Sequence, residues 1–405
     1  MNCNICKNKI NNVFLNLGKT PPANSLIINK NRLSSEKKFN LIVYLCKKCW
    51  LVQTKQIVSK KIFFNNKYPY YSSVSESWLK HSKSFVSKII RKLKLNKFSK
   101  VIEIASNDGY LLQYFKKKQI PCLGIEPSKN TAIIAQKKGI KVIKKFFSYE
   151  LSKKISPKVD LVICNNVLAH VPNLMNFVKG LENTINQKGI ITIEFPHLKN
   201  LIKKIQFDTI YHEHYFYFSL IALEKIFTKC NLKIFNVDKI STHGGSLRVY
   251  LCKKNNQIKI SKTVKETLDD EINFGLKRIK TYLLFKKKVQ LLKKRSKYFI
   301  KKCIANNKVI DVYGAAAKGI TFLNYLKVSK NQVRYAYDAS KFKINKYLPL
   351  SHIPIYSPDK IIKYKPDYLL ILPWNIQREI KNKLNFVKSW KCKLVTLIPI
   401  IKIHK

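Results

Sequence analysis

The 405-residue sequence predicts an α/β protein with a small cysteine-bearing N-terminal module followed by two doubly wound domains. Three observations predict this. Two Cys-x-x-Cys pairs lie within the first 49 residues, short apolar strands alternate with helices between residues 100 and 252, and a shorter alternation follows from 309 to 372. We expect three domains, comprising residues 1–66, 67–240 and 241–405.

The N-terminal module is predicted to be a zinc-binding domain. Its four ligands would be Cys3, Cys6, Cys46 and Cys49. A two-residue gap lets two thiolates of one turn face the same ion, and two such turns complete a closed, structural tetrahedral site. The strand-like stretches Asn12–Leu17 and Phe39–Leu45 would bring the two turns together. Four unligated cysteines at these spacings remain the alternative.

The middle of the chain alternates strands and helices, as a parallel doubly wound sheet requires. Strands are expected at Val101–Ala105, Leu123–Ile125, Lys141–Ile143, Leu161–Cys164, Ile190–Phe195, Leu232–Val237 and Leu247–Cys252. Helices are expected at Tyr110–Lys118, Lys129–Lys138, Pro172–Asn186 and Ser219–Cys230. In such a sheet the ligand binds where the strands end, so the loop after the first strand should contact a cofactor.

That loop favours S-adenosylmethionine over a dinucleotide. It keeps a single glycine, Gly109, whereas a pyrophosphate needs bare backbone close by. Carboxylates are present instead: Glu103 in the first strand, Asp108 in the loop, and Glu126 at the end of the second strand, where ribose hydroxyls are bound. A cationic, phosphate-free cofactor suits this set. The alternative is that Asp108 only caps the helix from Tyr110.

The C-terminal third predicts a second, smaller doubly wound domain. The Lys-rich stretch Lys259–Asn307 has helical spacing and should form one or two helices between domains. A strand at Val309–Tyr313, a small-residue loop at Gly314–Gly319 and a helix at Ile320–Leu326 follow. Further strands are expected at Arg334–Tyr337 and Asp367–Leu372.

Composition argues against membrane insertion and against nucleic acid as the main partner. Lys and Arg number 79 against 22 Asp and Glu, but only seven of them are the arginines that phosphate-reading proteins favour, and the lysines are spread along the whole chain. This pattern indicates compositional drift, although it should still attract anionic substrates. Lysines interrupt every apolar run before the ~18 residues that span a bilayer, and the N-terminus lacks a signal-peptide core. We therefore expect a cytoplasmic protein with reduced thiols.

Several strings occur together in one order along the chain. They are the two Cys-x-x-Cys pairs, EIASNDGYLL, GIEPS, NNVLAHVPN, IEFPHL, FDTIYHEHYFYFS, HGGSLR and VYGAAAKGITFLN. In this order the chain resembles the sugar C-methyltransferases, whose type members are the nucleotide-deoxysugar 3-C-methyltransferases of antibiotic pathways. The resemblance covers essentially the whole chain. It implies a zinc-binding N-terminal domain, a class I (Rossmann-like) S-adenosylmethionine-dependent methyltransferase core and a Rossmann-like C-terminal domain that helps to hold a nucleotide sugar.

The resemblance also implies site residues. The catalytic set would be His214 as base, with Tyr211, Glu213, His170 and Tyr70 around it. The cofactor would contact Glu103, Asn107, Asp108, Gly109, Glu126 and Asn165. The substrate would contact Arg248, Ser246, Lys318, Asp338 and Lys343. Lys318 in its small-residue loop suits a diphosphate, and Asp338 a sugar hydroxyl, although a tight turn without a ligand remains possible.

The chemistry agrees with the residue types. Putting a methyl group on carbon needs a carbanion equivalent, most easily an enolate beside a ketone, so a base with a pKa near ~7 must remove the α-proton. Hydrogen-bond donors such as tyrosine must then stabilise the enolate oxygen. We expect a nucleotide-sugar substrate, S-adenosylmethionine, structural Zn²⁺ and a monomer with no specific nucleic acid or membrane partner. Two alternatives stay open: methylation of nucleic acid, and a non-catalytic scaffold that binds zinc and nucleotides.

Overall fold

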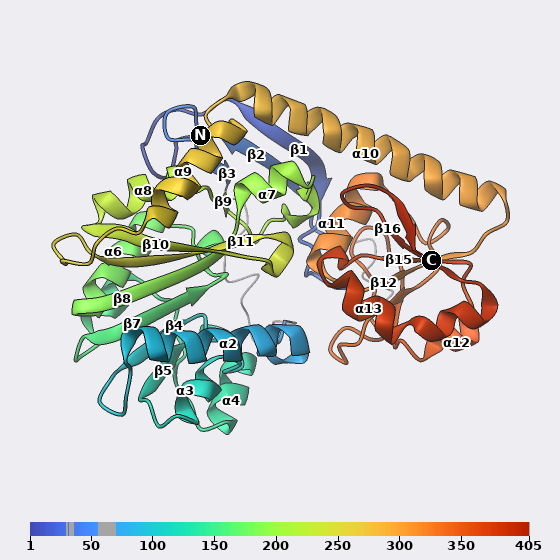
Figure 1. Cartoon of the computed structure of the whole chain (residues 1–405). Helices are drawn as coiled ribbons and strands as arrows, with labels where there is room; N and C mark the ends of the chain where they lie inside the picture. The colour runs from blue at the N-terminus through green and yellow to red at the C-terminus, as the bar shows by residue number, and fades with distance from the viewer. Residues whose placement is uncertain (30, 32–35, 56–69, 405) are drawn as a thin grey trace.

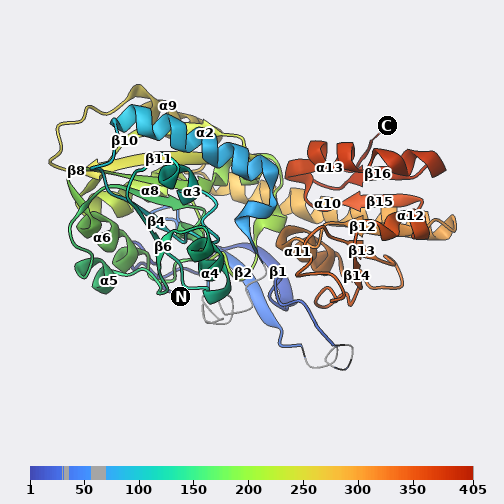
Figure 2. The ribbon, with the colours of Figure 1, turned by 90° about the horizontal axis from the view of Figure 1, so that it is seen from below.

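The computed structural model describes residues 1–29, 31, 36–55 and 70–404, and the predicted boundary between residues 66 and 67 lies outside them. Figure 1 shows the sheet of the middle region on the left and the C-terminal domain on the right, with a long helix spanning both. Figure 2 shows strands β1 and β2 of the N-terminal module between these two bodies. All three parts of the chain therefore meet near the centre of the molecule.

The N-terminal module is built on an antiparallel sheet. In the described residues its order is β1-β2-β3-β9, with bounds β1 Val13–Thr20, β2 Phe39–Leu45, β3 Val52–Thr54 and β9 Phe216–Tyr217. The two strands predicted here exist, and β1 runs three residues further than expected. Strand β9 belongs to the middle region, and it pairs with β3 through Val52 opposite Tyr217. The module is thus joined to the middle region by this strand pairing.

The middle region forms a mostly parallel sheet with the order β10-β11-β8-β7-β4-β5-β6 in the described residues. The bounds are β4 Val101–Ile104, β5 Cys122–Ile125, β6 Lys141–Ile143, β7 Val159–Asn165, β8 Ile185–Pro196, β10 Leu232–Ile240 and β11 Ser246–Lys253. Only β11 runs antiparallel to its neighbours β8 and β10. The chain order switches beside β4, so the carboxyl ends of β4, β5 and β7 meet where a ligand is expected.

Helices cover both faces of this sheet. They are α2 Glu76–Leu93, α3 Leu112–Lys116, α4 Lys129–Lys137, α5 Tyr149–Lys153, α6 Leu174–Thr184, α7 Leu198–Lys203 and α8 Leu220–Lys229. Helix α2 is absent from the elements predicted above. Ser75 caps its N-terminus by accepting the backbone N–H of Trp78, and Phe85 and Ile89 form its buried face. These apolar residues hold α2 against the sheet.

The C-terminal domain has a second, mostly parallel sheet. Over the described residues its order is β14-β13-β12-β15-β16-β17, with bounds β12 Ile310–Tyr313, β13 Ala336–Tyr337, β14 Ile355–Tyr356, β15 Tyr368–Ile371, β16 Lys393–Thr396 and β17 Lys402–His404. Its helices are α11 Ala317–Leu326, α12 Lys360–Tyr364 and α13 Gln377–Lys383. The second Rossmann-like domain predicted from sequence is present.

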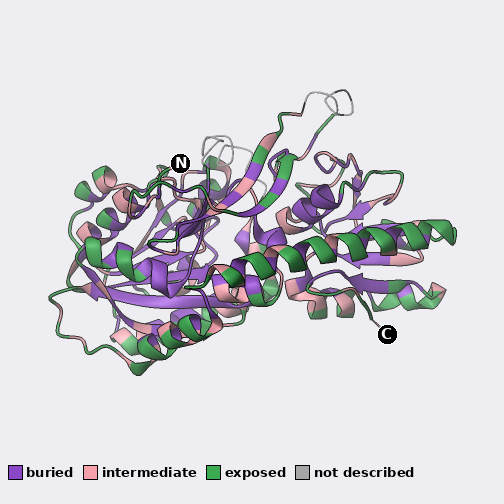
Figure 3. Cartoon of the chain, turned by 90° about the horizontal axis from the view of Figure 1, so that it is seen from above, coloured by how far each residue is buried: buried purple, intermediate pink, exposed green. Residues whose placement is uncertain are grey.

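Two helices connect the domains, α9 Lys262–Phe274 and α10 Ile279–Ala305. Gly275 separates them because it adopts the left-handed conformation (φ +93°) that ends a helix. Figure 3 shows the outward face of α10 exposed while the sheet strands are buried, so its lysines line a solvated surface. No helix in the described part of the chain is long and apolar enough to cross a bilayer.

Candidate active site

A cavity of about 640 Å³ opens at the carboxyl ends of β4, β5 and β7. All three parts of the chain contribute to its wall: Asn24 from the N-terminal module, the segment around His214 from the middle region, and Lys318 from the C-terminal domain. Five residues of the predicted catalytic set reach it, namely Tyr70, His170, Tyr211, Glu213 and His214. The topology thus brings together side chains that lie up to 144 positions apart in the sequence.

His214 is held as a neutral imidazole of known tautomer. Its Nδ1 lies 2.9 Å from the carbonyl oxygen of Thr209. A carbonyl can only accept, so Nδ1 carries the hydrogen and Nε2 carries the lone pair. Burial, together with the nearby His170 ring, lowers the pKa of His214 well below its usual value. The side chain therefore stays uncharged at neutral pH and can accept a proton at Nε2.

Two rings pack against His214 inside the cavity. The Tyr211 ring centroid lies 4.0 Å away and the His170 centroid 4.7 Å away. The Nδ1 of His170 lies 2.9 Å from the carbonyl oxygen of Glu213, which assigns the His170 tautomer in the same way. Burial lowers the pKa of His170 to about 4, so this ring is also neutral. His212, between them in sequence, lies outside the cavity wall and donates from Nε2 to the Phe39 carbonyl oxygen at 3.2 Å.

The Glu213 carboxyl is nearly buried, with 2% of its residue surface exposed. Burial raises its pKa to about 7, and a hydrogen bond from Asn24 opposes this rise. The Asn24 amide Nδ2 donates to Glu213 Oε1 over 2.6 Å. Glu213 is thus poised between its charged and neutral forms at physiological pH.

The predicted cofactor residues separate into two layers. Asn107, Glu126 and Asn165 line the cavity, whereas Asp108 and Gly109 lie behind the wall. Asp108 accepts hydrogen bonds from the Ser73 backbone N–H at 3.2 Å and from the Ser73 hydroxyl. The following helix has no side-chain cap, so the alternative that Asp108 only caps it is wrong.

Glu103 also lies behind the wall. It is fully buried in β4, and the Tyr110 phenol is its neighbour. Burial raises the pKa of Glu103 well above its ordinary value. A contact with the cofactor therefore remains a prediction for this residue.

The remaining wall fits S-adenosylmethionine. Glu126 directly follows β5 and accepts the backbone N–H groups of Asn107 at 2.9 Å and Ser128 at 2.8 Å, with lone pairs left for ribose hydroxyls. The amide Oδ1 of Asn165 and both polar atoms of the Asn166 amide are buried without a protein partner in the described residues. Both asparagines line the cavity, and buried polar atoms of this kind ordinarily have a partner. A polar ligand at the end of β7 would satisfy them.

The predicted substrate residues are only partly brought together. Lys318 and Lys343 line the cavity from the C-terminal domain. Asp338 lies behind them: its carboxylate accepts the Ala315 N–H at 2.7 Å, the Ser340 N–H at 2.8 Å and the Lys343 ammonium at 3.1 Å. Asp338 therefore shapes the loop after β12.

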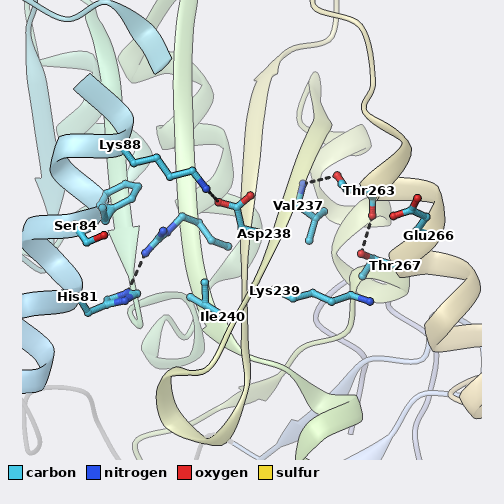
Figure 4. Close-up of a pocket in the computed structure, with 12 residues that line it drawn as sticks. His81, Ser84, Lys88, Val237, Asp238, Lys239, Ile240, Thr263, Glu266 and Thr267 are labelled. Carbon is cyan, nitrogen blue, oxygen red and sulfur yellow. Dashed lines mark hydrogen bonds and ion pairs between the residues drawn. The ribbon is translucent and has the colours of Figure 1, made fainter. Parts of the chain in front are cut away.

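The structure does not bring Ser246 and Arg248 to this cavity. Arg248 lines a second pocket of about 490 Å³ between α2, β10 and α9. Figure 4 shows this pocket, with His81, Asp238 and Thr263 among the labelled residues. Its guanidinium donates to the Glu194 carboxylate at 2.6 Å, and both residues are buried. Arg248 acts here as the partner of a buried acid.

Sequence reasoning missed several wall residues, namely Asn24, Trp78, His81, Thr242 and His243. The Trp78 ring stacks on His81, with centroids 5.0 Å apart, and lies tilted against His243 at 5.3 Å. His243 stands in the HGGSLR string and has a positive φ of 52°. That strained backbone next to two glycines, seen only in the structure, is the kind of feature that gathers at functional sites.

The four predicted zinc ligands form one cluster. The sulfur atoms of Cys3, Cys6, Cys46 and Cys49 all lie within 4.8 Å of one another. The Cys3–Cys49 pair is 3.3 Å apart and the Cys6–Cys46 pair 3.5 Å. Tetrahedral zinc with Zn–S bonds of about 2.3 Å needs sulfur atoms about 3.8 Å apart. The cluster therefore has the donors and the size to hold a structural Zn²⁺ ion.

The fold and the site together define a zinc-bearing methyltransferase that uses S-adenosylmethionine. Three family models match the chain in succession, described as a zinc binding domain (residues 3–64), a methyltransferase domain (78–237) and a C-methyltransferase C-terminal domain (241–399). The three models follow one another in the order in which the sequence predicted these domains. The resemblance, the fold class and both cofactors expected from the sequence are confirmed.

Individual proteins are also similar to this chain. C-methyltransferase NovU of Streptomyces niveus is 29% identical over 391 residues, which cover 96% of this chain and 93% of that protein. Among solved structures, magnesium protoporphyrin IX methyltransferase of Synechocystis is 17% identical, with a TM-score of 0.36 over 43% of this chain and 83% of that one. An S-adenosylmethionine-dependent methyltransferase of Clostridium acetobutylicum is 13% identical, with a TM-score of 0.36 over 43% and 92%.

Proposed function

We propose that this C-methyltransferase acts on a keto-deoxysugar linked to a nucleotide, and that His214 removes the proton from the carbon next to the keto group. The observation that carries the proposal is the state of His214: a neutral imidazole in the cavity wall whose Nδ1–H is held by Thr209. That arrangement leaves Nε2 as the atom that can take a proton. When this proton leaves the substrate, its electron pair stays on the carbon next to the keto group, and that carbon is the nucleophile that carbon methylation requires.

The surroundings of His214 suit an enolate. Its oxygen needs donors that strengthen their hydrogen bonds as negative charge develops, and the Tyr211 hydroxyl is one such donor. Burial raises the pKa of Tyr211 well above its ordinary value, so the phenol keeps its proton. The Thr209 carbonyl would stabilise the imidazolium that forms when His214 is protonated, since its Nδ1–H points at that oxygen.

The cofactor end of the cavity lies at the strand ends. S-adenosylmethionine supplies, when bound, a methyl group on a positively charged sulfur. Glu126 is the residue we expect to hold its ribose hydroxyls, with Asn107, Asn165 and Asn166 around the rest of the molecule. None of these four side chains carries a positive charge, which suits a cationic ligand.

The opposite wall suits an anionic substrate. Lys318 and Lys343 come from the C-terminal domain, and Lys318 lies at the start of α11, where backbone N–H groups favour a phosphate. Burial lowers the pKa of Lys318, and the charge of Asp208 opposes this. A diphosphate at this wall would place an attached sugar toward His214 in the same cavity.

Replacing His214 by asparagine tests the proposal. The variant should bind S-adenosylmethionine with unchanged affinity in calorimetry but lose methyl transfer to a panel of nucleotide-linked keto-deoxysugars, by at least ~100-fold for a general base. It should also lose exchange of the substrate α-proton into D₂O, followed by mass spectrometry without cofactor. His212→Asn, two positions away and outside the cavity, is the control and should keep both activities. Continued exchange in His214→Asn would remove this residue as the base.

A further inference from the structure

The N-terminal module sends one side chain into the active site. Asn24 lines the cavity and donates from its amide Nδ2 to Glu213 Oε1 at 2.6 Å, across 189 positions of sequence. A carboxylate can only accept in such a bond, so the amide nitrogen and not its oxygen faces Glu213. Hydrogen bonds to a charged carboxylate are roughly twice as strong as neutral ones. The contact therefore favours one orientation and the charged form of Glu213.

The turn that carries Asn24 is held on both sides by the C-terminal domain. Before it, the Thr20 hydroxyl accepts a hydrogen bond from the Asn324 amide at 3.1 Å. After it, the backbone of Ile27 exchanges two hydrogen bonds with Tyr347, at 3.0 and 2.9 Å. Two consecutive prolines precede Asn24 and restrict the backbone further. Asn24 is thus fixed by contacts between two domains, neither of which contains Glu213.

Other groups around Glu213 do not replace this donor. The titratable neighbours are the phenols of Tyr211 and Tyr215, with His170 bonded to the Glu213 backbone carbonyl and His214 next in the chain. Both imidazoles are neutral because burial lowers their pKa values. Among the described residues, Lys318 and Lys343 of the substrate wall direct their hydrogen bonds to Asn375 and Asp338. The hydrogen bond from Asn24 opposes the rise that burial causes in the pKa of Glu213.

We propose that Asn24 is a positioning residue that orients Glu213 and favours its charged form, so that the N-terminal and C-terminal domains jointly prepare the catalytic segment. The inference rests on the proposed function, because it assumes that Glu213 takes part in turnover. It gives the N-terminal module a role in the reaction site in addition to binding zinc.

The direct test is a titration of Glu213 by carbon-13 NMR of its side-chain carboxyl, identified by its loss in Glu213→Gln. In Asn24→Ala the midpoint should rise by about one pH unit or more, because the donor that favours the charged form is gone. Asn24→Asp, nearly identical in shape, should raise it further, since a second carboxylate then faces Glu213. Ser25→Ala, exposed on the same turn, is the matched control and should leave it unchanged. An unchanged midpoint in both Asn24 variants would overturn the proposal.

Turnover provides the second readout. Asn24→Ala should lower kcat by roughly 10- to 100-fold, the range for losing a hydrogen bond to a charged group, with little change in the KM for S-adenosylmethionine. In a Glu213→Gln background the same change should cost nothing more. Equal losses in both backgrounds would show that Asn24 acts independently of Glu213 and overturn the inference. If Glu213→Gln alone keeps full turnover, the catalytic role of Glu213 fails, while the NMR titration still decides whether Asn24 controls its charge.

Discussion

Replacing Arg248 by methionine should destabilise the protein strongly, although this residue lies outside the active-site cavity. Arg248 and Glu194 are buried with 3% and 0% of their surfaces exposed, and the guanidinium donates to the carboxylate at 2.6 Å. The guanidinium also lies 3.9 Å from the Phe85 ring centroid. Methionine fills much of the same volume but leaves Glu194 charged and buried. Removing one partner of such a pair costs about 3–5 kcal/mol.

The lowered pKa of Glu194 gives a similar size for the loss of stability. Burial alone would raise it, but the hydrogen bond to His81 and the charge of Arg248 lower it to about 2. Against the usual value of 4.5, this shift of about 2.5 units corresponds to about 3.4 kcal/mol in favour of the charged folded state. Because the folded pKa lies below the unfolded one, this stabilisation is complete above pH 4.5 and is lost as the pH falls toward 2.

Urea unfolding followed by circular dichroism measures the effect. In Arg248→Met, burial should dominate and raise the pKa of Glu194 above 4.5, so stability should now fall as the pH rises from 5 to 8, whereas wild type should not show this loss. Adding Glu194→Gln should restore most of the stability because no buried charge remains. Arg248→Lys keeps the charge and should be affected less. A loss below about 1 kcal/mol in Arg248→Met, or no recovery in the double variant, would refute the reasoning.

Two further outcomes are expected. Metal analysis of gently purified protein should find one tightly held zinc per chain, and protein purified without zinc would contradict the four-thiolate site. Removing the zinc with a chelator should lower methyl transfer, because strand β3 of the zinc-binding module pairs with β9, the strand that follows His214. Gly109→Ala should destabilise by about 2–4 kcal/mol, since its φ is +74° and a Cβ would lie 2.5 Å from Ile140 Cδ1. Gly18→Ala, with φ +84° and open space around it, should cost only about 1–2 kcal/mol; equal losses would rule out the clash.

Much of the fold could be predicted from the sequence because its strands are buried on both faces. β4, β7 and the stretch 189–195 of β8 consist almost entirely of buried residues, and such central strands appear in a sequence as short apolar runs. The ends of elements were predicted less well. The strand predicted to end at Ala105 ends at Ile104, because Ala105 adopts a positive φ of 58° that no pattern of apolar residues reveals. Helix α2 was missed altogether, although Ser75 and Glu76 form an ordinary N-terminal signal.

Residues of the cavity could be predicted from the sequence where several of them lie in one short motif. The YHEH string brings Tyr211, Glu213 and His214 to the cavity because they lie on one short segment between η4 (Phe207–Thr209) and β9. Arg248 shows the limit of this approach. Its string is adjacent to the cavity, but strand residues alternate between faces, and the neighbouring side chain decides whether an arginine contacts a ligand or a buried acid. That neighbour, Glu194, is 54 positions away and was not paired with it from sequence.

Residues supplied by another domain are the hardest to predict, and Asn24 explains why. Nothing in the local sequence distinguishes it from other asparagines in this Asn-rich chain. Its position depends on the pairing of β3 with β9, on the bond from Asn324 to Thr20 and on the bridge from Ile27 to Tyr347. Each of these contacts joins segments more than 150 positions apart. A site assembled between domains therefore depends on interfaces as much as on motifs. Substitutions at Asn324 or Tyr347, far from the cavity, would shift the turn that carries Asn24 and so weaken its hydrogen bond to Glu213.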